Sequence, residues 1–222
     1  MLDLRSTSPR QWVGAVLEQF GQLQAGTGLV LCCDASPQPV LHELQQLHGD
    51  VLEWHPLVDG PPLWQTILGR RHTSAIRRGV MALMTADHRR IHDLLQQIVD
   101  HARRRDHDAL TTTLQHFETG LRKHIQMEEE LLFPVISSKL GTPRGPAVVL
   151  REEHVAIQEL LASLWDGCRS SAPDRDLTDT AQVLQNLLEN HSGIEERILY
   201  AVTDLLLTND ERLALIKQCQ QL

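Results

Sequence analysis

The sequence is poor in aromatic residues, in paired cysteines and in long apolar runs, and each shortage excludes a class of protein. Phe, Trp and Tyr make up 4% of the 222 residues, so Leu, Ile and Val must form most of the core. The four cysteines contain no Cys-x-x-Cys pair, which argues against a disulfide framework. No apolar run approaches the ~18 residues that a transmembrane helix needs. We therefore expect no membrane segment.

Basic residues are outnumbered by acidic ones, 21 to 29. The formal net charge is −8, and an acidic chain is a poor partner for nucleic acid. The first residues lack the charged-then-apolar layout of a signal peptide, so we expect the protein in the cytoplasm. Apolar residues make up 41% of the chain, enough to bury a sizeable core.

Histidine, by contrast, is abundant, and part of it belongs to a pattern that occurs twice. The chain has 12 histidines. Each copy places one His three residues before an Ile, and a later His four residues before a Glu-Glu pair: His88-x-x-Ile91 with His124-x-x-x-Glu128-Glu129, then His154-x-x-Ile157 with His191-x-x-x-Glu195-Glu196. The two histidines lie 36 residues apart in the first copy and 37 in the second. A duplication of this kind predicts paired helices around a shared centre.

The first 70 residues predict an α+β module in the order β-α-β-α-β-β, with its helices on one face of a sheet. We expect strands at 2–4, 28–33, 51–54 and 63–67, with a turn at Asp59-Gly60-Pro61 before the last one. Helices are expected from Ser8-Pro9, with Ser8 as the cap, and over 39–47. In the strand at 28–33, Cys32 and Cys33 should face opposite sides; a buried position is the favoured interpretation, and a redox-active thiol the alternative.

Residues 71–80, with three arginines, are interpreted as a basic linker that is solvated. Residues 81–222 predict an all-α up-down four-helix bundle with a short final helix. The expected helices cover 81–103, 107–138 with a bend near Pro134, 147–167 and 177–206, and Asn209-Asp210 should cap the last one.

Apolar stripes along these helices direct six ionisable side chains inward: His88, His124, Glu128, His154, His191 and Glu195. Burying them is costly unless they share partners, and metal ions supply such partners. Two metals that share two bridging Glu, with two His each, would have four protein ligands apiece. Iron, manganese and zinc suit this donor set.

Some neighbouring residues offer alternatives. Glu196 is a rival to Glu195 as a ligand. His92 follows His88 by one turn but falls off the inward stripe, so we assign it a flanking role. Phe133 and Tyr200 occupy equivalent positions in the two copies, and core packing is favoured over a redox role.

Residues 81–206 resemble a hemerythrin-like, His-His-Glu cation-binding domain, through Asp87-His88-x-x-Ile91, His124-x-x-x-Glu128-Glu129-x-x-Leu-Phe-Pro134, Glu153-His154-x-x-Ile157 and His191-x-x-x-Glu195-Glu196. The resemblance implies a non-haem di-iron centre, two Fe ions with an oxo or hydroxo bridge, held by the six residues above.

One departure refines the resemblance. Oxygen-carrying hemerythrins have a second His one turn after the third helix's histidine, where this chain has Gln158. The chain is more similar to the cytoplasmic subgroup that handles nitric oxide and repairs iron–sulfur centres under nitrosative stress. This implies NO or O2 as the ligand and an iron–sulfur protein as a possible client; no electron donor is implied.

The first 70 residues also resemble a TusA-like module, through Asp3-Leu-Arg5, Asp34-x-x-Pro37-x-Pro39, Trp54 and Gly60-Pro61-x-x-Trp64. Sulfur carriers of that fold use a Cys before the first helix, where this chain has Ser8-Pro9, so persulfide transfer is not expected. Related modules often carry a His after the aspartate, where this chain has Ala35.

Three functions follow as hypotheses. The first is a di-iron protein that binds or reduces NO, or supports repair of iron–sulfur clusters. The second is a sensor of O2 or redox state that signals to the N-terminal module. The third is a structural protein with zinc or no metal. A ferritin-like site is disfavoured, because such sites use Glu-x-x-His and more carboxylates.

Overall fold

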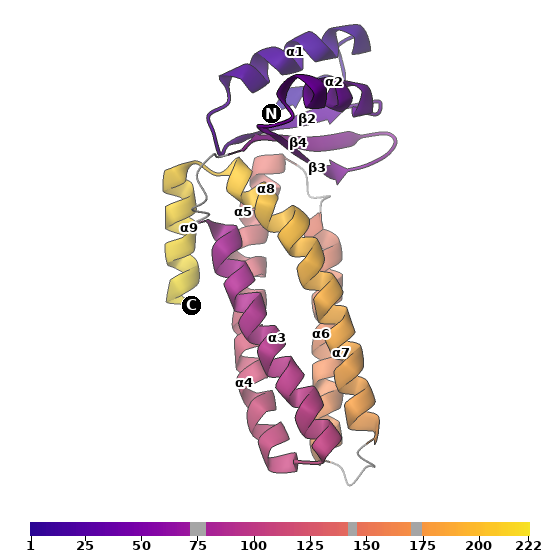
Figure 1. Cartoon of the computed structure of the whole chain (residues 1–222), viewed down its shortest axis with the longest axis vertical. Helices are drawn as coiled ribbons and strands as arrows, with labels where there is room; N and C mark the ends of the chain where they lie inside the picture. Colours follow the sequence, from indigo (N-terminus) through magenta and orange to yellow (C-terminus); the bar gives the residue numbers. More distant parts are fainter. Residues whose placement is uncertain (72–78, 142–145, 170–174) are drawn as a thin grey trace.

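A small sheet with two helices precedes a mostly helical region, which confirms the predicted fold class. The computed structural model describes residues 1–71, 79–141, 146–169 and 175–222. Figure 1 shows the sheet lying across one end of a long four-helix bundle. Most of the basic linker predicted at 71–80 lies outside the described residues, and the first bundle helix begins at Val80.

The N-terminal module has the predicted order of strands and helices: β1 (Leu2–Asp3), α1 (Pro9–Gln22), β2 (Gly28–Cys33), α2 (Gln38–His48), β3 (Leu52–Val58) and β4 (Trp64–Arg70). The strands lie in the order β1-β2-β4-β3. β1 runs parallel to β2, and the other neighbours are antiparallel. The last two strands extend beyond their predicted ends.

Both faces of the sheet are covered. Leu29, Leu31 and Cys33 of β2 pack with the core residues of α1 and α2, which confirms helices on one face. Val30 and Cys32 alternate with them and pack with residues of the bundle. Burial raises the pKa of the Cys33 thiol to about 11, and all four cysteines are free. An exposed redox-active thiol in this strand is therefore not supported.

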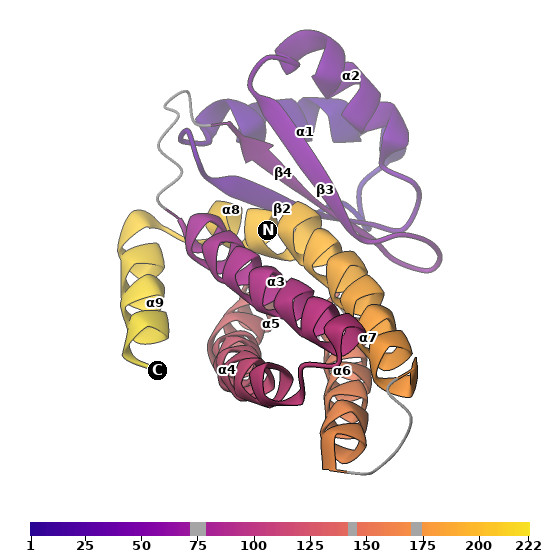
Figure 2. The same ribbon diagram turned by 60° about the horizontal axis from the view of Figure 1, so that its bottom comes forward.

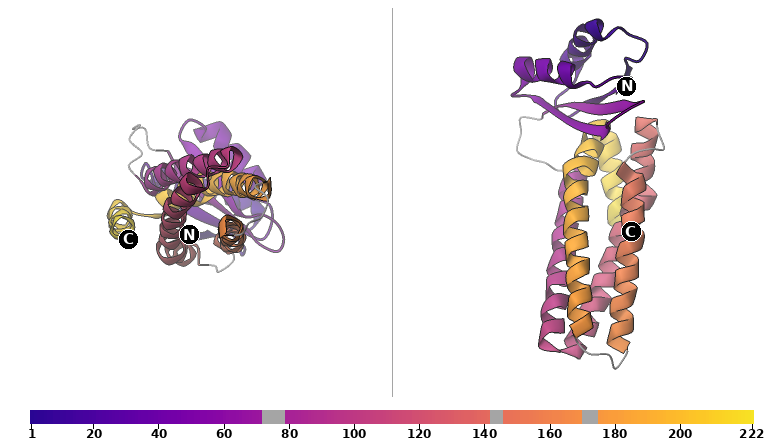
Figure 3. Two further views of the ribbon diagram at one scale, coloured as in Figure 1. Left: turned by 90° about the horizontal axis from the view of Figure 1, so that it is seen from below. Right: turned by 90° about the vertical axis from the view of Figure 1, so that its right-hand side faces the viewer.

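The bundle consists of four long helical rods, two of which contain π-helical turns (Figure 3). Their elements are α3 (Val80–Arg104); α4 (His107–Gln126), η1 (Met127–Leu132) and α5 (Phe133–Leu140); α6 (Pro146–Arg169); and α7 (Arg175–Ile194), η2 (Glu195–Leu199) and α8 (Tyr200–Leu206). The predicted bend near Pro134 corresponds to the π turn that ends just before Phe133. No proline lies in or after the second π turn, and no residue of the sequence predicted it.

Of two predicted helix caps, one is confirmed in position and the other is wrong. Ser8 occupies the N-cap position of α1, but its side chain makes no capping hydrogen bond. The final helix α9 (Asn209–Gln221) is capped by Thr208, whose side chain forms a reciprocal capping box with Glu211. Thr208 is the cap in place of Asn209 because Glu211, which completes the box, lies three residues after Thr208.

The bundle and the sheet are joined through α8. Leu205 packs against the sheet so closely that a Cβ built at Gly69 would lie 2.6 Å from its Cδ2 atom. Figure 2 shows α8 lying beneath β2. The Asp204 carboxylate accepts hydrogen bonds from the backbone N–H groups of Val80 (2.9 Å) and Met81 (3.1 Å), and so caps α3 from α8. The module and the bundle therefore share one continuous core.

Inside the bundle, two apolar clusters lie one above the other along the helices. The upper cluster includes Met84, Leu132 and Phe133, and extends to the sheet. The lower cluster includes Ile91, Leu121 and Leu188. Between them lies a layer of buried polar side chains. In the described part of the chain, no helix combines the length and the apolarity that crossing a bilayer requires.

Candidate metal centre

All six residues predicted as ligands meet in the polar layer of the bundle. α3, α4, α6 and α7 each contribute one histidine, and the two π turns contribute the glutamates. The side chains form two groups: His88, His124, Glu128 and Glu195; and Glu128, His154, His191 and Glu195. Within each group the potential ligand atoms lie within 4.8 Å of one another. Both glutamates are fully buried.

Each glutamate divides its two oxygens between the groups. Glu195 Oε2 lies 3.2 Å from His88 Nε2, and its Oε1 lies 3.0 Å from His191 Nε2. Glu128 Oε2 lies 3.1 Å from His154 Nε2, while its Oε1 lies 3.7 Å from His124 Nε2. This is the arrangement that carboxylates bridging two cations require.

The outer nitrogen of every histidine in the layer contacts a carboxylate. The four pairs are His88–Glu196 (2.9 Å), His124–Asp87 (3.0 Å), His154–Glu129 (2.7 Å) and His191–Glu153 (2.7 Å). Because an ionised carboxylate only accepts hydrogen bonds, each Nδ1–H must donate. A neutral imidazole then carries its lone pair on Nε2, which faces the centre.

The six side chains fit cations because they contain more hydrogen-bond acceptors than donors. His154 Nε2 lies 3.1 Å from His191 Nε2, so two inward lone pairs face each other when both rings are neutral. With these rings neutral, no hydrogen-bond donor reaches Glu128 Oε2 or Glu195 Oε1, and both oxygens are buried. Such atoms are costly in a low-dielectric interior unless a positive charge lies among them.

Protons are the alternative positive charge, and the pKa values of the histidines reflect this. Burial alone would lower the pKa of His191, but the hydrogen bond to Glu195 and the charge of that carboxylate outweigh it and raise the pKa to about 9. The pKa values of His88 and His154 are raised against burial in the same way, by Glu195 and by Glu128 respectively. Metal ions must therefore compete with protons.

The π turns decide which member of each Glu-Glu pair points inward. Glu128 and Glu195 are fully buried, whereas the side chains of Glu129 and Glu196 are 35% and 36% exposed and reach the outer nitrogen of a histidine. Glu195 thus takes the inward position for which Glu196 was a rival. π turns often mark functional sites, because the extra residue re-aims the side chains around it.

One difference between the two halves of the centre is a hydroxyl group. The Tyr200 hydroxyl donates a hydrogen bond to Glu128 Oε1 (2.5 Å) and lies 3.1 Å from His88 Nε2. The equivalent residue, Phe133, has no polar group, and its ring stacks on His154 with the centroids 5.9 Å apart. Core packing was the favoured interpretation for both residues. It holds for Phe133, whereas the Tyr200 hydroxyl contacts side chains of the ligand groups directly.

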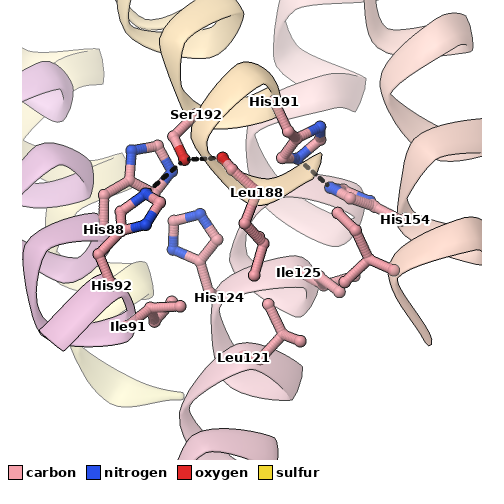
Figure 4. A pocket seen from close by; sticks show the side chains of 11 residues that line it. His88, Ile91, His92, Leu121, His124, Ile125, His154, Leu188, His191 and Ser192 are labelled. Atoms are coloured by element: carbon pink, nitrogen blue, oxygen red, sulfur yellow. Dashed lines mark hydrogen bonds between the residues drawn. The ribbon is translucent and has the colours of Figure 1, made fainter. Parts of the chain in front are cut away.

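A small cavity lies beside the four histidines, on the side of the lower apolar cluster. Figure 4 shows Ile91, Leu121, Ile125 and Leu188 around it, together with His92 and Ser192. His92 Nε2 and Ser192 Oγ are 2.8 Å apart, and His92 is absent from both ligand groups among the described residues. Gln158 is exposed and does not line this cavity.

Sequence reasoning missed the roles of Asp87, Glu153, Glu129 and Glu196. A usable signal existed, because each of the four directly adjoins a ligand residue in the chain, and the same placement occurs in both copies. The role of Tyr200 had a weaker signal. It is the single tyrosine of the sequence and occupies the position where the first copy has Phe133.

Fold and site together define a helical-bundle protein with a buried His/Glu group able to hold cations. The model of the hemerythrin HHE cation binding domain matches residues 80–203, and the chain belongs to this family. Residues 1–70 match an uncharacterized conserved protein family, DUF2249. That match does not confirm the TusA-like resemblance, which stays a prediction. Neither a curated protein nor a solved structure matches the chain significantly.

Proposed function

We propose that the chain holds two iron ions between its four helices and uses them to bind or reduce nitric oxide, either to remove it or in support of iron–sulfur cluster repair. The observation that carries this proposal is the pair of ligand groups that share Glu128 and Glu195, next to a small cavity. Four protein ligands for each ion leave coordination positions free for a small molecule.

The family and the donor set support iron. Imidazole and carboxylate ligands suit iron, manganese and zinc, and the hemerythrin family implies iron among these. Bound iron would supply the redox chemistry and the affinity for a diatomic molecule. The chain's own residues would do the rest. The four outer carboxylates fix each imidazole ring and raise the basicity of its inward nitrogen.

The surroundings of the centre favour a small, uncharged ligand. The cavity walls are mostly apolar, which keeps water and ions away from the histidines. Tyr200 holds a proton within reach of Glu128, on the His88 side of the centre only. Gln158, which stands where oxygen carriers have a further histidine, lies on the surface and leaves the six-residue set without a seventh donor from α6.

A second candidate function is sensing of O2 or redox state, with the N-terminal module as the receiver. The direct packing of α8 on the sheet favours it. Glu195 and Leu205 belong to one uninterrupted helical rod, and Leu205 touches the sheet at Gly69. A shift of Glu195 on oxidation would thus reach the module along a rigid element.

Anaerobic addition of NO to the reduced, iron-loaded protein tests the first function. We expect optical and electron paramagnetic resonance changes typical of NO bound to iron, and N2O as a product if NO is reduced. The absence of any spectral change would reject NO as the ligand. Reversible O2 binding with slow autoxidation, and a changed module–bundle contact on oxidation, would instead favour the sensor.

A further inference from the structure

The two copies of the duplicated pattern meet along two seams, α3–α7 and α4–α6. At two successive positions below the metal centre, only the α3–α7 seam is closed by pairs of polar side chains. In the α3–α7 seam, His92 pairs with Ser192 at 2.8 Å, and Gln185 donates a hydrogen bond to Gln96 at 2.9 Å. These bonds join the helices just below the metal centre. α3 also packs more extensively along α7 than α4 does along α6.

The α4–α6 seam has different residues at the equivalent positions. Gln158 and Ile125 replace the His92–Ser192 pair, and an isoleucine cannot complete a hydrogen bond. Ala162 and Glu118 replace Gln96 and Gln185, and an alanine side chain cannot reach across. Glu118 instead accepts a hydrogen bond from Trp165 Nε1 at 3.0 Å.

A groove of about 530 Å³ runs along this open seam. Leu121, Ile125, Leu161 and Ala162 give it apolar walls. Charged side chains, including Arg122 and Asp166, line its rim. The groove is thus polar at its mouth and apolar within, which lets a neutral molecule enter and disfavours an ion.

Leu121 and Ile125 line both the groove and the small cavity beside the histidines. They are 2% and 7% exposed, so these two side chains separate the solvent-filled groove from the buried cavity. Movements of single aliphatic side chains between rotamers are fast and cost little compared with unfolding of a helix.

We propose that the α4–α6 groove is the entrance through which a neutral molecule of two or three atoms reaches the metal centre, with Leu121 and Ile125 as its gate. This inference rests on the proposed function, since it concerns the ligand of the same site. It relates the difference between the seams to access. Polar pairs close the α3–α7 seam beside the cavity, whereas the equivalent positions of the α4–α6 seam have no such pairs.

Substitution of Ala162 by Trp tests the entrance, because this exposed side chain lines the groove and lies outside the ligand groups. Gln96→Trp, at the equivalent position of the closed seam, is the matched control. In stopped-flow measurements on the reduced, iron-loaded protein, Ala162→Trp should slow both NO association and NO dissociation about tenfold, with little change in affinity. Gln96→Trp should change neither rate by more than about twofold. Ile125→Ala, which trims the gate, should speed both.

A second readout needs no iron. Dissolved O2 is paramagnetic and speeds the nuclear relaxation of methyl groups that it visits. In the diamagnetic, zinc-loaded protein we expect this effect at methyls of Leu161, Ile125 and Leu188, and its loss at Leu188 in Ala162→Trp. Unchanged NO rates in Ala162→Trp, or O2 effects only beside His92 and Ser192, would overturn the entrance. A protein that takes up O2 along the groove but never binds NO would instead reject the proposed function.

Discussion

The two copies of the duplicated pattern agree in everything that holds the centre together and differ in what surrounds it. Both supply two histidines, one inward glutamate from a π turn, and two outer carboxylates that contact imidazole nitrogens. They differ where Tyr200 replaces Phe133 and where Leu205, which touches the sheet, replaces the exposed Ser138. The groups that could hold cations are thus the same in both copies. The second copy adds the Tyr200 hydroxyl and the contact of Leu205 with the module.

The largest expected effect is the loss of a shared carboxylate. Glu195→Gln replaces one of the two carboxylate oxygens by an NH2 group and removes the negative charge that both groups share, so metal content should fall to less than about one ion per chain. Glu128→Gln should give the same result, because the copies are equivalent here. Metal analysis after reconstitution measures it. Glu196→Gln is the control, and a greater loss in that variant would make Glu196 the ligand.

The outer carboxylates come next. Glu153 accepts the Nδ1–H of His191 at 2.7 Å, and Glu153→Gln weakens that bond and the orientation of the ring. Metal affinity, measured by competition with a chelator, should fall about 10–100-fold. The neighbouring Glu152 is exposed, and Glu152→Gln should leave the affinity unchanged. Equal affinities in the two variants would contradict the role given to Glu153.

The hydroxyl of Tyr200 should affect only one half of the centre. Tyr200→Phe removes the hydrogen bond to Glu128 and restores the equivalence with Phe133. Stepwise metal titration by calorimetry should show one of the two binding steps changed by about tenfold and the other unaffected. Phe133→Leu, which alters packing without removing a hydroxyl, should shift neither step selectively. Equal changes in both steps after Tyr200→Phe would mean that the hydroxyl acts on the whole centre.

Metal-free protein should lose stability as the pH rises, contrary to the metal-loaded form. The folded-state pKa of His191 is raised from 6.5 to about 9, so its protonation stabilises the empty fold fully below pH 6.5. That contribution is lost as the pH rises through about 9. The melting temperature of the metal-free protein should therefore fall across this range, while the stabilisation by added metal grows. A melting temperature of the metal-free protein that does not change with pH would contradict the claim that the inward lone pairs need a positive charge among them.

The smallest effect concerns the contact of the second copy with the sheet. Gly69→Ala places a Cβ 2.6 Å from Leu205, whose flexible end must shift, and we expect a loss of about 1–3 kcal/mol of unfolding free energy. Gly14→Ala, where no atom lies within 4 Å, is the control and should be neutral or slightly stabilising. Chemical denaturation of both variants measures the difference. Equal stabilities would mean that α8 adjusts freely beneath the sheet.

Much of this arrangement could be predicted from the sequence, because helical periodicity and duplication are local signals. The inward stripes predicted the six residues that the structure brings together, and the order of the elements was also predicted. The duplication favoured Glu195 but left Glu196 as a rival, since the choice depends on a π turn that no residue of the second copy predicts. The sequence analysis also missed that α8 covers the second face of the sheet. Apolar residues in a strand predict that a face is buried, but they do not identify the element that covers it.

Anaerobic metal analysis of protein purified without added metal, combined with an optical spectrum, tests the central claim most directly. Two groups of ligands that share Glu128 and Glu195 predict two iron ions per chain, with both lost together in Glu195→Gln. The spectrum should change on addition of NO. Stoichiometric zinc, or iron that survives the loss of Glu195, would contradict the account.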